Sequence, residues 1–276
     1  RVSRSSALAS KATGYPIARV AAKVAVGLTL DEIISPSTGL AYANKEPVLD
    51  YVVVKIPRWP FDKFGEANRA LGTQMKATGE TMAIDVSFSA ALLKAIRSLE
   101  TDTMGLSLPY LRQLQDSELM RRLEEADDER LFLLAEAMGR GIDIKTLHYL
   151  TGIDPWFLDE IQSLVDLEKQ LQAQPYPGTL HHCATLQKAK EIGLADATLA
   201  HIWNVTEDEI RDARLKAGLM PSYQEISVNA NRREAAPAYY YSSYGDKAGT
   251  FSEAGKKVLI IGAGPIRIGQ GIEFDY

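Results

Sequence analysis

The sequence has almost no cysteine and no long apolar segment. Its single cysteine, Cys183, excludes an internal disulfide framework and is typical of a reducing compartment. No apolar run approaches the roughly 20 residues that cross a bilayer, and no charged and then apolar leader follows Arg1. Since 46% of the 276 residues are hydrophobic, enough for a buried core, we expect a globular, cytoplasmic protein without a membrane span.

The net charge of −5 is unevenly distributed along the chain. Residues 1–100 carry 13 Lys and Arg against 9 Asp and Glu, residues 101–220 carry 12 against 21, and residues 221–276 carry 6 against 6. A mildly basic first segment suits anionic ligands, whereas an acidic middle segment repels a phosphate backbone. The charge pattern therefore argues against nucleic acid as a partner and indicates different roles for the two segments.

The first hundred residues mix helix and strand patterns. Small residues and valines at helical spacing predict a tightly packed helix within residues 1–30. The β-branched run from Tyr51 to Ile56 predicts a buried strand that stops at Pro57. Met82 to Ile84 predicts a second short strand, and residues 90–99 return to a helical pattern.

Residues from about 102 to 220 have a helical pattern almost throughout, with no convincing strand. Asp154 can cap a helix whose first residue is Pro155. Thr206 and Glu209 have the spacing of a capping box for a further helix. We therefore expect an all-α domain of short amphipathic helices in this region.

The pattern changes again after the helical region. Residues 221–255 are rich in Pro, Ser, Asn, Gly and Tyr and predict a linker, with a short strand at Tyr239 to Tyr241. Lys256 to Ile261 predicts a buried parallel strand that enters a glycine turn at Gly262. Because a parallel strand needs partners reached by long crossovers, and Arg1 is not an initiating Met, we expect an internal fragment of a longer polypeptide.

Three residues carry chemistry suited to an anion or to an interior charge. Arg1 and Arg4 lie among three serines, and two guanidinium groups can hold a carboxylate or phosphate bidentately. A solvated basic segment is the competing and more frequent use of such residues. Glu80 precedes an apolar strand, where its carboxylate is either an interior functional group or an ordinary surface group.

The sequence gives little support for a dinucleotide or zinc site. The turn from Gly262 through Gly264 places its third glycine, Gly269, two positions too late for the dinucleotide fingerprint. Residues 181–183, His-His-Cys, are adjacent, so their side chains would point to different faces of a helix. No second ligand cluster exists in the sequence, and we expect no metal site formed by this chain.

Several longer strings resemble one known family, in the family's order and over nearly the whole chain. They are RVSRSSALASKATGYP at residues 1–16, VKIPRW at 54–59, QMK at 74–76 with GE at 79–80 and MAI at 82–84, IDPWFL at 153–158, and residues 262–276. Together they resemble the large subunit of glutamine-hydrolysing carbamoyl phosphate synthetase.

The resemblance implies a ligase built from two ATP-grasp halves. Members make carbamoyl phosphate from bicarbonate, glutamine-derived ammonia and two ATP, for arginine and pyrimidine biosynthesis, with Mg²⁺ or Mn²⁺ and K⁺ in the full-length enzyme. By this resemblance residues 1–101 end the first ATP-grasp (carboxyphosphate) half, and residues 102–255 are the all-α oligomerization domain plus linker. Residues 256–276 would be the first βα element of a Rossmann-like pre-ATP-grasp domain that opens the carbamoyl phosphate half. The expected fold class is thus mixed α and β.

The resemblance also assigns site residues. Arg1 and Arg4 are similar to arginines that contact the bicarbonate-derived anion and phosphate in the first synthetase site, where they would stabilise a transferring phosphoryl group. Five positions match the lining of the tunnel that carries carbamate between the two active sites: Ala12, Met75, Glu80, Gly271 and Glu273. No cofactor-binding residue is assigned, and the fragment alone is expected to bind no cofactor fully and to be inactive.

The implied partners are the rest of the large subunit, a glutaminase small subunit and a second copy that associates through the helical domain. Two stretches depart from the family pattern: Asp85 to Ser87 stands where Gly-Arg-Thr is usual, and Glu225 to Arg233 stands where a Val-Asp-Thr-Cys-Ala-like string is usual. The second departure favours an alternative function, a non-enzymatic helical oligomerization or interaction scaffold. Retention of the assigned site residues argues against that alternative.

Overall fold

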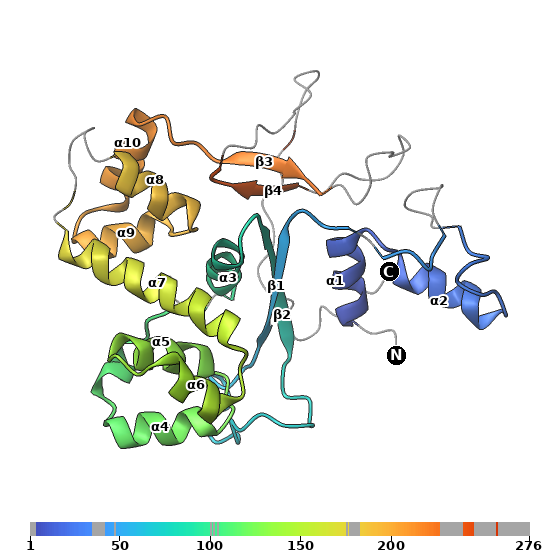
Figure 1. Cartoon of the computed structure of the whole chain (residues 1–276), viewed down its shortest axis with the longest axis horizontal. Coiled ribbons are helices and arrows are strands. Elements are labelled where there is room, and N and C mark those ends of the chain that lie inside the picture. Colours follow the sequence, from blue (N-terminus) through green and yellow to red (C-terminus); the bar gives the residue numbers. More distant parts are fainter. Residues whose placement is uncertain are drawn as a thin grey trace.

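The structure, a computed structural model, describes residues 4–34, 42–46, 48–99, 101, 103, 105–174, 176, 183–226, 240–245 and 258. In these residues the fold is mixed α and β: two small antiparallel sheets, a pair of amino-terminal helices and a larger helical domain (Figure 1). Within the same part of the chain, no helix combines the length and apolarity required to span a bilayer.

Two helices, α1 (Arg4–Thr13) and α2 (Ile17–Ala25), occupy the region predicted as one helix. The break falls at Gly14, which has a left-handed φ of +64°, and at Pro16, which precedes the first turn of α2. A left-handed residue ends the first helix, and proline has no N–H to continue it. The prediction of a single helix is therefore wrong.

The main sheet pairs β1 (Val52–Arg58) with β2 (Gly79–Asp85) in antiparallel register, with Val54 opposite Ala83. Both strands were predicted, but the expected stop at Pro57 is wrong, because Pro57 lies inside β1 opposite Glu80. In the described residues this sheet has only these two strands, so each strand is an edge where proline is tolerated.

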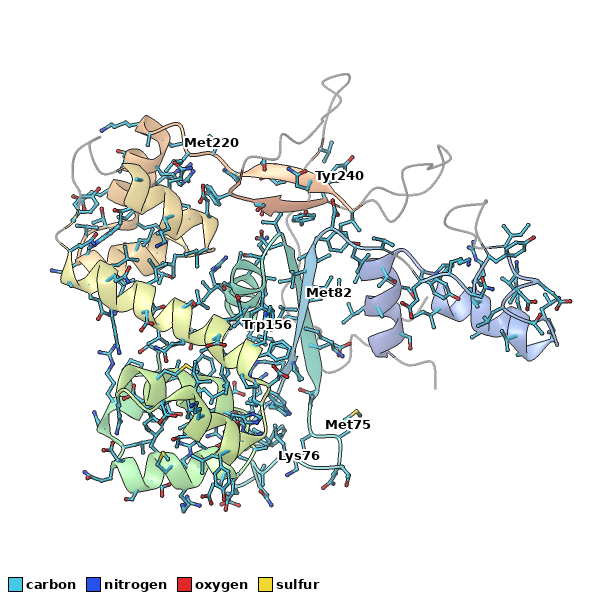
Figure 2. All side chains as sticks on the ribbon, in the orientation of Figure 1. Met75, Lys76, Met82, Trp156, Met220 and Tyr240 are labelled. Carbon is cyan, nitrogen blue, oxygen red and sulfur yellow. The ribbon has the colours of Figure 1, made fainter. Side chains whose placement is uncertain are left out.

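The two faces of this sheet contact different parts of the fold. Helix α3 (Phe88–Arg97) packs on one face and begins at Ser87, whose Oγ accepts a hydrogen bond of 3.3 Å from the Ala90 N–H. The other face carries Met82, which Figure 2 shows on the side of α1. Because successive strand residues point to opposite faces, Glu80 and Met82 share the α1 side, whereas Thr81 is buried against α3.

The helical domain confirms the expectation for residues 102–220, within the residues described. It comprises η1 (Pro109–Gln113), α4 (Asp116–Glu124), α5 (Arg130–Gly139), α6 (Ile144–Thr151), α7 (Pro155–Ala173), α8 (Cys183–Glu191), α9 (Asp196–Trp203) and α10 (Glu207–Lys216). Both predicted caps are confirmed: Asp154 accepts from the Trp156 N–H at 2.9 Å, and Thr206 and Glu209 form a complete capping box. Helix α7 connects the group α4–α6 with the group α8–α10 (Figure 1).

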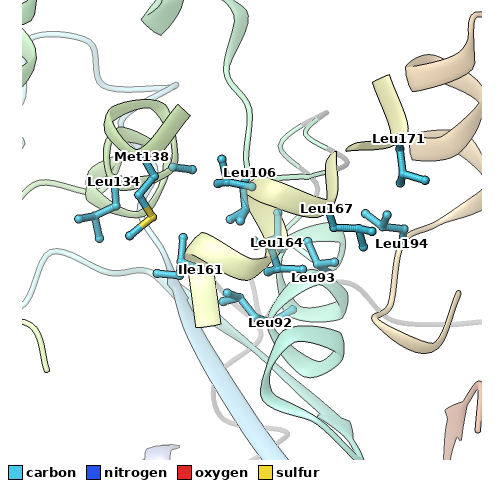
Figure 3. Close-up of a cluster of buried hydrophobic side chains, with 14 of the residues drawn as sticks. Leu92, Leu93, Leu106, Leu134, Met138, Ile161, Leu164, Leu167, Leu171 and Leu194 are labelled. Atoms are coloured by element: carbon cyan, nitrogen blue, oxygen red, sulfur yellow. The ribbon is translucent and has the colours of Figure 1, made fainter. Parts of the chain in front are cut away.

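One hydrophobic core joins the main sheet to the helical domain. Side chains of α3, α5 and α7 meet in it: Leu92, Leu93, Leu134, Met138, Ile161 and Leu164 are all buried (Figure 3). Fully burying one such side chain stabilises a fold by about 1.5–3 kcal/mol. This shared core fixes the position of β1 and β2 relative to the helices.

A second antiparallel hairpin, β3 (Ser222–Glu225) and β4 (Tyr240–Ser243), lies near one end of the main sheet (Figure 1). The strand predicted at Tyr239 to Tyr241 is therefore present, shifted toward the carboxyl terminus. The predicted strand from Lys256 to Ile261 and its glycine turn lie outside the described residues, apart from Val258.

Candidate functional site

Four of the predicted site residues have no described side chain. Arg1, Gly271 and Glu273 lie outside the described residues, and Arg4 is the first residue of α1, with only its backbone described. The roles assigned to these four residues therefore stay predictions.

Ala12 is buried where α1 meets the beginning of the main sheet. Its side chain is 4% exposed, and its carbonyl oxygen accepts a hydrogen bond from the hydroxyl of Tyr51. Burial, and next the charge of Asp50, raise the pKa of Tyr51, so its hydroxyl stays protonated and able to donate. This contact fixes α1 against the residue that precedes β1.

Glu80 lies on the α1 side of the sheet with its charge only partly satisfied. It forms an ion pair with Lys55 of β1, diagonal to it across the ladder. Its Oε1 atom is buried and has no hydrogen-bond donor among the described residues. A buried carboxylate oxygen without a donor is uncommon and costly in a folded protein.

Met75 lies apart from the other two described tunnel candidates. Its side chain is 88% exposed in the connection between β1 and β2, and Figure 2 shows it beyond the lower end of the sheet, apart from Met82. Ala12 and Glu80 both belong to the α1 side of the sheet. The structure thus associates two of the predicted tunnel residues with one face and leaves the third in solvent.

Sequence reasoning missed an ionic cluster that joins the sheet, α3 and the second hairpin. Lys94 Nζ lies 2.7 Å from Asp85 Oδ2 and donates to the Ser242 carbonyl at 2.6 Å. Ser243 Oγ donates to Asp85 Oδ1 at 2.8 Å. Asp85 was noted only as a departure from the family pattern, and that departure is the one sequence signal that could have identified the cluster.

Two tyrosine rings extend this cluster toward α1. The rings of Tyr51 and Tyr241 are 5.8 Å apart, and Lys94 Nζ lies 5.9 Å from the Tyr241 ring centre. Burial, followed by the charges of Asp50 and Asp85, raises the pKa of Tyr241 to about 12. A continuous set of contacts therefore runs from Ala12 through the tyrosines to the hairpin.

A second charged cluster fastens the connection between β1 and β2 to the helical domain. Arg69 binds Asp128 through two hydrogen bonds of 2.8 Å and also pairs with Glu129. Arg122 pairs with Glu129 at 2.8 Å and with Asp127 at 2.7 Å. Bidentate guanidinium pairs of this kind fix geometry as well as charge.

The described residues do not form a recognisable metal site. Among them, no group of three or more His, Cys, Asp or Glu side chains is arranged to hold a metal ion. His181 and His182 lie outside the described residues. A divalent cation therefore does not fit the donor sets of the described part of the chain.

Comparison with known families gives three matches in order along the sequence. Residues 1–33 match the carbamoyl-phosphate synthase L chain, ATP binding domain. Residues 80–218 match the carbamoyl-phosphate synthetase large chain, oligomerisation domain, and residues 254–276 match the carbamoyl phosphate synthase preATP-grasp domain. The oligomerisation match begins within β2 and ends just after α10, so it covers α3 and the whole helical domain.

The oligomerisation match, residues 80–218, covers half of the chain by itself. The other two matches flank it in the order expected from the sequence motifs. The mixed fold with its helical domain agrees with them. The chain belongs to the carbamoyl-phosphate synthetase large chain family.

Proposed function

We propose that the chain is a segment of an ATP-dependent ligase subunit that makes carbamoyl phosphate from bicarbonate and glutamine-derived ammonia, for arginine and pyrimidine biosynthesis. The observation that carries the proposal is the order of the three family matches: ATP binding, oligomerisation and preATP-grasp. We propose that residues 1–101 end the first ATP-grasp half, residues 102–255 are the oligomerization domain with its linker, and residues 256–276 open the second half, although the oligomerisation match itself begins earlier, at residue 80.

Arg1 and Arg4 would serve the first synthetase site. Each carries a permanently charged guanidinium group that can bind two oxygens of a phosphoryl group or carboxylate. Such groups accelerate phosphoryl transfer by stabilising charge that develops on the transferred group.

The carbamate tunnel would pass along the α1 side of the main sheet. Ala12 and Glu80 belong to this side, and the carboxylate of Glu80 suits the polar wall of a passage for a small polar intermediate. Met75, Gly271 and Glu273 complete the proposed lining. Small residues such as Ala12 and Gly271 would keep the passage open.

ATP is the cofactor that the ATP-binding match supports. Mg²⁺ or Mn²⁺ and K⁺ belong to the proposal for the complete subunit. We propose that the chain by itself is inactive. Incubation with ATP, Mg²⁺ and bicarbonate should release no ADP above the rate without protein, and release that depends on bicarbonate would contradict this.

The helical domain would mediate self-association, as the oligomerisation match indicates. Tyr149 of α6 and Trp156 of α7 are 87% and 52% exposed, so each ring is accessible to a partner. Aromatic residues are enriched in protein interfaces. Sedimentation velocity should show a larger species as the protein concentration rises, and a monomer at all concentrations would contradict the proposal. The glutaminase small subunit is a further proposed partner.

A further inference from the structure

A cavity of about 570 Å³ is lined by residues of β1, α3 and the helical domain, and none of the tunnel candidates is part of its lining. Its lining includes Val54 of β1 and Leu92 of α3 as well as Leu108 and Leu131 of the helical domain. Its volume is within the range of about 300–1,000 Å³ that is typical of small-molecule sites. The core that joins sheet and helices holds these elements in place.

Six aromatic side chains line this cavity together with eight charged ones, of which Asp62, Asp127, Asp128 and Glu129 are acidic. The aromatic side chains are Trp59, Phe61, Phe88, Tyr110, Phe132 and Phe157. The rings of Phe88 and Phe157 are 5.5 Å apart and tilted by 60°. Aromatic walls favour a planar apolar ligand, because offset and edge contacts between rings add to the burial of apolar area.

The cationic side chains that line the cavity differ in whether they form an ion pair. Lys55 pairs with Glu80, Arg58 pairs with Asp62, and Arg69 pairs with Asp128 and Glu129. Arg130 has no ion pair among the described residues. Its Nη2 donates to the carbonyls of Leu123 and Thr151, at 3.1 and 3.2 Å.

The Nε atom of Arg130 is buried and has no acceptor in the described part of the chain. Burial of the guanidinium also lowers the pKa of Arg130, although the charge of Asp127 opposes that effect. An anionic group beside the guanidinium would give Arg130 the ion pair that it lacks among the described residues.

We propose that this cavity binds a small planar, apolar molecule that carries one carboxylate, and that Arg130 holds the carboxylate while the aromatic walls enclose the ring. Its lining contains none of the residues assigned to the first synthetase site or to the carbamate tunnel. It would give this chain a binding function beyond the proposed ligase activity.

The experiment is a calorimetric titration of the 276-residue chain with 1-naphthoate and with its uncharged analogue 1-naphthamide. Naphthoate should bind at one site, at least about tenfold more tightly than naphthamide, because a hydrogen bond to a charged group is the stronger one. Arg130→Met should remove this preference. Arg112→Met is the matched control, since Arg112 lies outside the lining and donates to Ser107, and it should leave both affinities unchanged.

The position of the ligand can be read without any substitution. Nuclear Overhauser effects should connect the naphthyl protons to Phe88 and Leu131 in the wild-type chain. The proposal is overturned if neither compound binds at millimolar concentration, if the preference for naphthoate survives Arg130→Met, or if the ligand protons contact residues outside the cavity. Far-UV circular dichroism of each variant shows whether it has folded.

Discussion

Lys94 Nζ lies 2.7 Å from Asp85 Oδ2, and the second oxygen of the same carboxylate accepts a hydrogen bond of 2.8 Å from Ser243 Oγ. Three separate elements, β2, α3 and the second hairpin, therefore meet at one buried charge. Asp85 stands where the resembled family usually has glycine, so the departure supplies a specific anchor for the hairpin.

Removing the Asp85 carboxylate should weaken this junction. Asp85→Ala leaves the Lys94 ammonium, which is about a quarter exposed, without its ion pair and should lower the free energy of unfolding by about 2–4 kcal/mol. Urea denaturation measures the loss. Asp62→Ala is the control, because Asp62 forms an exposed i,i+4 pair with Arg58 that is worth less than about 1 kcal/mol. Equal losses for the two variants would contradict the anchoring role.

Gly193 should tolerate no side chain. It has a φ of +101° in the turn between α8 and α9, and an added Cβ would lie 2.6 Å from the Ala90 Cα of α3. Gly193→Ala should therefore cost about 2–4 kcal/mol, from overpacking together with backbone strain.

Gly141 provides the matched control for Gly193. Its φ is +89°, but nothing lies within 4 Å of an added Cβ, so Gly141→Ala should cost only about 1 kcal/mol of backbone strain. Thermal unfolding of the two variants compares them directly. A similar loss for both would mean that the turn does not pack tightly on α3.

Glu129 should make the stability depend on pH. Burial tends to raise the pKa of Glu129, but hydrogen bonds from Arg122, Tyr110 and Arg69 outweigh burial and lower it. With a folded pKa below the unfolded value of about 4.3, its contribution is complete above that pH and is lost as the pH falls through the folded pKa.

Glu129→Gln should therefore cost about 1–2 kcal/mol at pH 7 and reduce the fall in stability between about pH 5 and pH 3. Urea titrations at several pH values measure both effects. Glu124→Gln is the control, because Glu124 is exposed on α4 and should change neither quantity. An unaltered pH profile for Glu129→Gln would show that its ion pairs contribute nothing to folding.

Local signals in the sequence were enough to predict most elements. The caps at Asp154 and Thr206 depend on side chains within three residues, and both are confirmed. The signal for a helix break at Gly14 is equally local, but the helical spacing of the valines favoured the prediction of a single helix. The expected strand end at Pro57 is wrong because proline is tolerated in an edge strand. Only the pairing of the sheet shows that β1 is an edge in the described residues.

The contacts that form the candidate sites could not be predicted in the same way. Arg69 and Asp128 are 59 residues apart, and Asp85 and Ser243 are 158 apart, so only the packed fold brings them together. The cavity at Arg130 likewise requires β1, α3 and α5 to be placed relative to one another. Family strings located Ala12 and Glu80, but only the structure associates both with one face of the sheet.

The most direct test of the account replaces the corresponding segment of a complete large chain of this family by residues 1–276. We expect the chimera to make carbamoyl phosphate from bicarbonate, ATP and ammonia, and we expect Arg4→Met to abolish its bicarbonate-dependent ADP release. A folded, associated chimera whose activity is unaffected by Arg4→Met, or one without synthesis, would contradict the ligase role and favour a non-enzymatic helical scaffold.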